Sequence, residues 1–256
     1  MKSKYFTVEV LPTLPASIQA DAYADTEILF DWTSFDVPKG ASKLISITAL
    51  VRGTDGADQA STFDFELFFA KTRDGGATAP PTLGTTGALV TKSGWQNHLI
   101  GRTEIDASAD SNDGDLVYMN VMTSASDSIN WNPLVLQGEP NSGINVGYDK
   151  LYVAGISKAA FDFSTTVLAR GGESAGVTVV ETDKGSDDDP DADLIFVPGD
   201  VLHSVTDDVL GTVKSIAAFG SSKQDITFTA PIPDAIADNE EIYNVNPIRL
   251  IFSFEK

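Results

Sequence analysis

Apolar and polar residues alternate along much of this chain, and this pattern constrains the fold more than any other feature. Between residues 63 and 69, apolar side chains at the odd-numbered positions alternate with Asp64 and Glu66. The segment 44–52 repeats the pattern with an apolar face running from Ile45 to Val51, and 248–254 repeats it at the C-terminal end. A period of two residues is typical of strands that are buried on one face. No long segment has the 3.6-residue period of a helix.

The spacing of these apolar segments predicts an all-β protein. The 21 Gly and 12 Pro residues lie between the apolar runs, as expected for many short strands joined by turns. We expect an antiparallel sandwich, jelly-roll-like, over residues 1–175, and a small β-barrel-like module over 176–256. The boundary is placed where the composition shifts, near Gly171–Gly176. The alternative is that the last strand returns to the first sheet and makes one continuous body.

The pattern also predicts the individual strands and their connections. The strands of the sandwich are expected at 5–10, 27–32, 43–52, 62–70, 88–91, 98–105, 115–123, 134–137, 150–155 and 161–169. Those of the module are expected at 194–197, 200–204, 209–216, 224–229 and 248–254. A short helix is expected over Ile232–Glu241. The segment Leu11–Ala24, which contains two prolines, is expected to be an irregular connector, and its alternative is an arm that lies on a neighbouring subunit.

Charge and cysteine content exclude several classes of function. The formal net charge is −20, from 37 acidic and 17 basic residues. Such an excess of negative charge repels phosphates, which basic residues must neutralise, so we expect no binding to nucleic acid or to an anionic membrane surface. The absence of cysteine rules out disulfides, thiolate zinc sites and thiol nucleophiles. Pro12 and Pro15 interrupt the apolar character near the N-terminus, so we expect no secretory signal.

The sequence offers few groups that could carry out chemistry, and we predict no catalytic, cofactor-binding or metal-binding residue. His98 and His203 are the only imidazoles, too few for a structural zinc site without other ligands. The acidic run Asp183–Asp193 departs from the EF-hand pattern, because Ala192 occupies the position of the required glycine. We expect it to be a solvated loop. Trp32, Trp95 and Trp131 are expected to pack in the protein, and the alternative is that they stack on sugar rings as in a carbohydrate-binding module.

Three residues break the alternation and are predicted to lie in an interface between chains. Phe68, Leu50 and Ile251 point away from the apolar face of their own strands. In a two-layer sandwich the outer face of each sheet is in contact with water. An apolar residue there packs under a loop or meets another chain. The second interpretation predicts a homo-oligomer or lattice member, in which Phe68→Asp leaves the monomer folded but weakens its incorporation into particles.

Three groups of segments resemble structural proteins of tailed phages, in particular phages of marine bacteria and cyanobacteria. The first comprises ILFDWTSFDVPKGA at 28–41 with 51–56 and 65–71, the second 136–140 with 146–155, and the third 198–202 with 210–213 and 241–248. The third is also similar to small barrel modules of phage structural proteins. The resemblance implies a β-rich virion component that is present in many copies and has no catalytic residues.

Charge and compartment refine what this resemblance implies. The net charge of −20 disfavours a position against packaged DNA and favours the outer surface of the virion. We therefore expect a decoration or cement protein on the capsid, with the major capsid protein and copies of itself as partners. A tail or baseplate component is the alternative. Assembly in the host cytoplasm agrees with the absence of cysteine.

Overall fold

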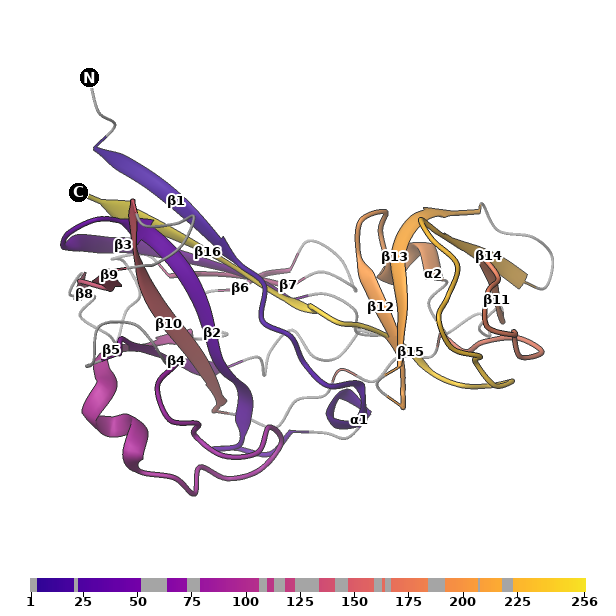
Figure 1. Cartoon of the computed structure of the whole chain (residues 1–256), viewed down its shortest axis with the longest axis horizontal. Helices are drawn as coiled ribbons and strands as arrows, with labels where there is room; N and C mark the ends of the chain where they lie inside the picture. The colour runs from indigo at the N-terminus through magenta and orange to yellow at the C-terminus, as the bar shows by residue number, and fades with distance from the viewer. Residues whose placement is uncertain are drawn as a thin grey trace.

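The computed structural model is all-β, with antiparallel sheets and, in the described part of the chain, only two four-residue α-helices and one short 3-10 helix (Figure 1). It describes residues 4–20, 23–51, 64–72, 79–105, 110–112, 118–122, 134–140, 147–158, 163, 167–183, 192–206, 208–217 and 223–256. Two sheets form one body, which we call the two-sheet body. A third sheet forms a separate unit beside it, which we call the inserted module.

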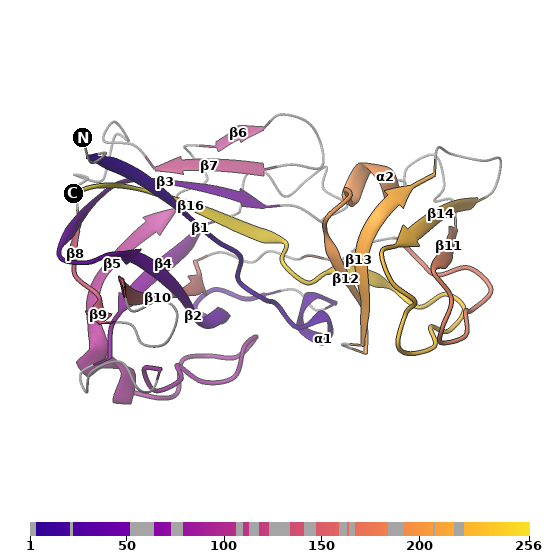
Figure 2. The same cartoon turned by 45° about the horizontal axis from the view of Figure 1, so that its top comes forward.

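The first sheet of the two-sheet body contains both ends of the chain. Its order is β1 (Tyr5–Val10), β16 (Ile248–Glu255), β3 (Ser42–Val51), β7 (Tyr118–Met122) and β6 (Asp110–Asn112), and β8 (Leu134–Leu136) pairs with the start of β3. All these pairs are antiparallel. The chain therefore begins and ends on neighbouring strands, as Figure 2 shows.

The second sheet lies opposite the first. Its order is β2 (Ile28–Pro38), β10 (Tyr148–Ser157), β4 (Phe65–Ala70) and β5 (Leu99–Ile105), and β9 (Glu139–Pro140) pairs with β10. A cluster of aromatic rings joins the two sheets. The ring centroid of Phe252 in β16 lies 5.3 Å from that of Phe35 in β2 and 5.4 Å from that of Phe69 in β4. Tilted and edge-on aromatic pairs of this kind add about 1 kcal/mol each beyond the burial of their area.

A bulge changes which residues of β3 face the core. The pairing of β16 with β3 shifts between Ser253 and Phe254, whose partners are Ser46 and Leu44. Ile45 is the extra residue, so Leu44 is buried and Ile45 is only half-buried. The expectation that Ile45 continues the apolar face of Ile47, Ala49 and Val51 was therefore wrong. One inserted residue reverses the orientation of everything beyond it.

The inserted module holds the third sheet. Its order is β11 (Val179–Asp183), β14 (Lys223–Phe228), β13 (Val209–Ile216), β12 (Val201–Ser204) and β15 (Ile242–Asn244), and α2 (Ala192–Ile195) packs beside it. The strand expected last in this module, 248–254, lies instead between β1 and β3 as β16. The module therefore sits between β10 and β16 in the chain, and the last strand returns to the first sheet, as the alternative to a division at residue 175 predicted.

Three smaller expectations were also wrong. The segment 194–197 contributes to the helical turn α2, because an apolar run of four residues does not distinguish helix from strand. The helix expected over 232–241 is absent from this described segment, where Ile236 instead bridges Glu173. The strand expected at 88–91 is reduced to a single bridge between Leu89 and Glu27.

A loop of the same chain covers the outer face of the second sheet. The segment 79–98, which includes the 3-10 helix η1 (Gly94–His98), runs beneath this sheet in Figure 1. Phe68 packs under it, is only 8% exposed, and makes an edge-on contact with Trp95 at 5.5 Å between centroids. Phe68 therefore packs under a loop, which is one of the two expectations for an apolar residue on this face. It is not an exposed interface residue in this chain, and the alternation does not reveal a cover supplied by a distant loop.

This burial reverses the expected effect of a charge at position 68. Phe68→Asp places a carboxylate among Trp95, Leu83 and Ile156, so we expect it to lower the free energy of unfolding by about 4 kcal/mol or to prevent folding. Urea denaturation followed by circular dichroism measures the effect. Val135→Asp is the matched control because Val135 is 68% exposed, and it should change stability by less than about 0.5 kcal/mol. Equal stabilities of the two variants would contradict the burial of Phe68.

Candidate functional site

The N-terminal arm, residues 11–20, joins the two-sheet body to the inserted module. The side chain of Leu14 is fully buried in the core of the body, while its backbone N–H donates to the carbonyl of Val245 at 3.0 Å. Asn246 Nδ2 lies 2.9 Å from the carbonyl of Pro12 and 3.2 Å from that of Leu11. The arm thus lies on its own chain in this structure, and it is an ordered connector with one helical turn, α1 (Ala16–Gln19).

A buried amide at the end of the arm strengthens this junction. Gln19 has no exposed surface, and its Nε2 donates to the carbonyls of Leu14 and Asn244, each at 3.0 Å. The same nitrogen lies 3.2 Å from Nε2 of His203, a residue of β12 that is 3% exposed. One side chain therefore satisfies a carbonyl of the arm and a carbonyl of β15. No sequence motif points to Gln19, because its partners are backbone atoms far away in the chain.

Loss of this amide should weaken the junction. Gln19→Leu keeps the approximate size of the side chain but leaves two buried carbonyls without their donor. We expect a loss of about 2 kcal/mol in unfolding free energy and faster amide hydrogen exchange in β12 and β15 than in β16. Gln96→Leu changes an exposed glutamine and should leave both quantities unchanged. Wild-type exchange rates in Gln19→Leu would show that the amide does not hold the junction.

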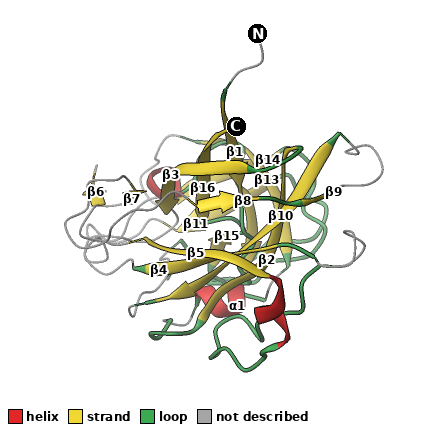
Figure 3. Ribbon diagram, turned by 90° about the vertical axis from the view of Figure 1, so that its left-hand side faces the viewer, coloured by secondary structure: helices red, strands yellow, loops and turns green. Residues whose placement is uncertain are grey.

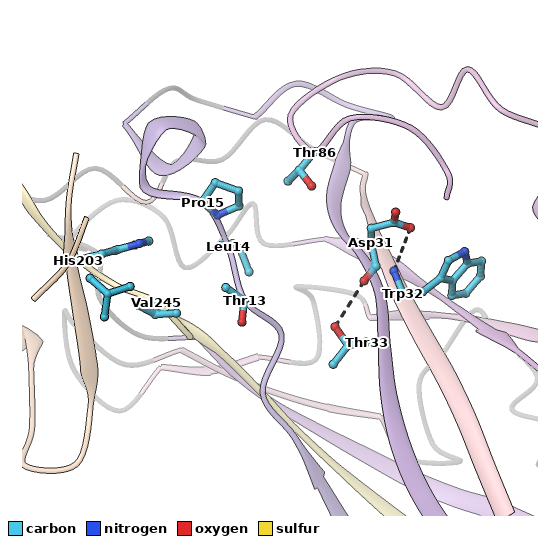
Figure 4. A pocket seen from close by; sticks show the side chains of 10 residues that line it. Thr13, Leu14, Pro15, Asp31, Trp32, Thr33, Thr86, His203 and Val245 are labelled. Carbon is cyan, nitrogen blue, oxygen red and sulfur yellow. Dashed lines mark hydrogen bonds between the residues drawn. The ribbon is translucent and has the colours of Figure 1, made fainter. Parts of the chain in front are cut away.

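An open groove with a volume of about 680 Å³ lies at the same junction. The arm contributes Thr13, Leu14 and Pro15, and the inserted module contributes His203, Val209 and Val245. The other wall is made by residues 31–33 of β2, together with Thr86. Figure 4 shows the arm between His203 on one side and β2 on the other. Three parts of the chain that are distant in sequence therefore meet around one space, which sequence patterns alone do not reveal.

Asp31 is held in a fixed orientation at this groove. Its Oδ1 accepts the backbone N–H of Trp32 at 2.9 Å and that of Leu83 at 3.3 Å. Its backbone carbonyl accepts the hydroxyl of Thr33 at 3.4 Å. These bonds occur at a register shift between β2 and β10, where β2 is the edge of its sheet. Local bonds of this kind use backbone groups that an edge strand would otherwise present to another chain.

The predicted interface residues Leu50 and Ile251 lie on the outer face of the first sheet. Both are half-buried, and their outward-facing neighbours on adjacent strands include Arg249 beside Leu50 and Thr48 beside Ile251. At one end of this face a row of paired residues crosses four strands: Tyr5, Glu255, Lys43 and Val135. Tyr5 and Val135 are 56% and 68% exposed. Figure 3 views the body from this end. The structure therefore brings Leu50 and Ile251 onto one face of the first sheet, whereas Phe68 lies under a loop on the second sheet.

Two ion pairs lie on the outer face of the first sheet. Lys4 pairs with Glu255 and Arg249 pairs with Glu9. The hydrogen bond from Lys4 holds the pKa of the Glu255 carboxyl below its usual range, and the same bond raises the pKa of Lys4. These side chains are exposed, so the pairs contribute little to stability. They do fix charges of both signs beside the apolar side chains.

The other sequence candidates lie apart from one another. His98 Nδ1 bonds to the carbonyl of Lys71 at 3.0 Å in the two-sheet body, whereas His203 lies in the module. Trp95 is 7% exposed, and Trp32 donates its indole N–H to the carbonyl of Pro81. Trp131 and most of the acidic run, 184–191, fall outside the described residues. Within the described ranges no group of three or more His, Asp or Glu is placed to hold a metal ion.

Tyr23 is the one described group with a large pKa shift. It is 1% exposed and packs edge-on against Phe163 at 5.8 Å. Burial raises the pKa of its phenol, and the Glu27 carboxylate raises it further. The folded protein therefore favours the neutral phenol. Its contribution to stability is complete below the ordinary tyrosine pKa of about 10 and is lost as the pH rises above that value.

We therefore expect Tyr23 to make the protein sensitive to alkali. Between pH 9 and 11, Tyr23→Phe should lose less stability than the wild type, because phenylalanine has no proton to release. Urea midpoints across this range measure the difference. Tyr5→Phe removes an exposed phenol and should keep the wild-type profile. If Tyr23→Phe follows the same profile as the wild type, Tyr23 does not carry the alkaline loss.

Comparison with known proteins gives no relative for this chain. A scan against models of protein families finds no match, and searches of curated proteins and of solved structures find none either. Separately, no helix in the described residues is long and apolar enough to cross a membrane.

Proposed function

We propose that this chain is a structural protein that acts by docking onto other proteins, and that it is a virion component of a tailed phage. The specific role that we propose is a decoration or cement protein on the outer capsid, assembled in the host cytoplasm. Its proposed partners are the major capsid protein and copies of itself. Neither nucleic acid nor a membrane is among them, in keeping with the net charge of −20.

The observation that carries the proposal is the outer face of the first sheet. Leu50, Ile251, Tyr5 and Val135 lie there among short hydroxyl side chains such as Thr7, Ser46, Thr48 and Ser253. Short side chains lose little rotamer freedom when they are covered. Apolar side chains with charged neighbours match the usual composition of a protein interface, which has an apolar centre and a polar rim. The resemblance to phage structural proteins supplies the virion context.

We also propose that the two-sheet body is jelly-roll-like and that the inserted module is barrel-like. Strands β1 to β4 alternate between the two sheets along the chain, which supports a jelly-roll-like connection. In the module, Ala169 bridges Thr182 of the edge strand β11, and Leu168 bridges Glu241, which directly precedes the other edge strand, β15. The segment 167–170 therefore bonds to both edges of the five-stranded sheet, which supports a small barrel-like closure.

Two other functions remain as alternatives. A tail or baseplate role would use the same outer face on a different partner, and localisation on the particle separates it from a capsid role. A carbohydrate-binding module would use an exposed tryptophan. Trp32 and Trp95 instead pack together, with centroids 6.3 Å apart, and both are tied to backbone carbonyls. Two of the three tryptophans are thus engaged within the chain.

Antibody labelling of particles tests the virion proposal directly. Antibodies against the purified chain should co-sediment with intact phage particles from the source culture and label their heads in electron micrographs. Label on tails would replace the decoration role with the tail role. Label confined to the soluble fraction would overturn the virion proposal.

A double variant tests the outer face itself. Leu50→Glu with Ile251→Glu should leave the free energy of unfolding within about 1–2 kcal/mol of wild type, because both residues are only half-buried. Its occupancy on particles should fall at least tenfold. Val197→Glu, a charge added at a 43% exposed site on the module, is the matched control and should bind normally. Equal occupancy of all three proteins would exclude this face as the interface.

A further inference from the structure

We propose that the junction groove binds a basic segment of a partner protein, and that Asp31 receives the ammonium or guanidinium group of a Lys or Arg side chain. This inference names the chemistry of a partner and in that respect rests on the proposed docking function. It concerns a different surface from the outer face of the first sheet, so it can fail or succeed separately.

The groove and the module beside it carry negative charge. Among the described residues that line the groove there is one carboxylate, Asp31, and neither a Lys nor an Arg. The inserted module, which forms one wall, has 16 acidic and four basic residues between positions 167 and 246. Exposed Asp208 directly precedes the lining residue Val209. A cation is therefore attracted to the groove by Asp31 in its lining and, at longer range, by the net negative charge of the module.

The Asp31 carboxylate is held through only one of its two oxygens. Two backbone N–H groups hold Oδ1, from Trp32 and Leu83, while no described residue bonds to Oδ2. The side chain is half-buried and already oriented, so little freedom is lost when a ligand binds. A hydrogen bond to an ionised carboxylate is about twice as strong as a neutral one. Oδ2 is thus an oriented acceptor without a donor among the described residues.

The shape of the groove favours a long aliphatic side chain that ends in a cation. Half-buried Pro15 and Val245 provide apolar surface, and Val209 is 47% exposed. Thr33 and Thr86 place hydroxyls on the β2 side, near Asp31 (Figure 4). A volume of about 680 Å³ is within the range of sites that enclose a small ligand or a few side chains. The methylene stem of Lys or Arg packs on the apolar wall while its charge reaches the carboxylate.

A peptide titration tests this assignment. The probe is the pentapeptide acetyl-Ala-Arg-Ala-Arg-Ala-amide, and its control carries citrulline, which is neutral, in place of both arginines. We expect the arginine peptide to shift the backbone amide resonances of Leu14, Thr33 and Thr86 in NMR spectra of the full chain. The citrulline peptide should bind at least about tenfold more weakly, the loss expected for one charged contact. Raising the salt concentration should weaken the arginine peptide alone.

Matched variants separate the groove from overall charge. Asp31→Asn retains an acceptor for the two backbone N–H groups and should reduce affinity about tenfold. Asp234→Asn removes the same charge from an exposed site on the module that does not line the groove, and should bind as wild type does. Thr86→Trp should block the groove without changing the charge, which keeps the test valid if Asp31→Asn fails to fold.

Four outcomes would overturn the proposal. They are the absence of shifts at the groove, equal binding of the citrulline peptide, equal affinity of Asp31→Asn and Asp234→Asn, and unchanged binding to Thr86→Trp. None of these measurements uses virus particles. Failure here therefore leaves the particle-labelling test unaffected, and a negative labelling result leaves the peptide result intact.

Discussion

The pairing of β16 between β1 and β3 is the interaction on which the rest of the structure depends. This strand supplies Phe252, the ring that meets Phe35 and Phe69 of the opposite sheet, and Phe254, which stacks on Phe6 with centroids 5.1 Å apart. Without it, β1 has no partner strand among the described residues, and the centre of the core is open. Because β16 follows the inserted module in sequence, the two-sheet body is complete only after the module has been made.

This topology explains why the N-terminal arm matters. The return of β16 to the first sheet places Val245 and Asn246 next to the arm that follows β1. The arm then bonds to both residues and buries Leu14 in the body. Gln19 extends the same junction to His203 and Asn244. The same arm lines the groove.

Sequence patterns predicted the class of fold because several strands carry their own alternation. The odd-numbered residues of Phe65–Phe69 and the even-numbered residues of 248–254 are buried as their period of two requires. Local patterns fail where the deciding contact is distant. The cover over Phe68 comes from Trp95, the bulge at Ile45 depends on the register with β16, and the place of β16 depends on pairing across the whole chain. The groove is less predictable still, because Asp31 and Gln19 are fixed by backbone groups that every sequence possesses.

The absence of native cysteine gives a direct measurement of the central pairing. Thr7 and Ser253 are paired across β1 and β16 on the outer face, and residues opposite each other in an antiparallel pair lie within reach of a disulfide. Thr7→Cys with Ser253→Cys should form an intramolecular disulfide under mild oxidation, detected by mass spectrometry of peptic peptides. Thr7→Cys with Thr227→Cys, whose second cysteine lies on β14 of the module, should not. A disulfide in the second protein and none in the first would contradict the return of the last strand to the first sheet.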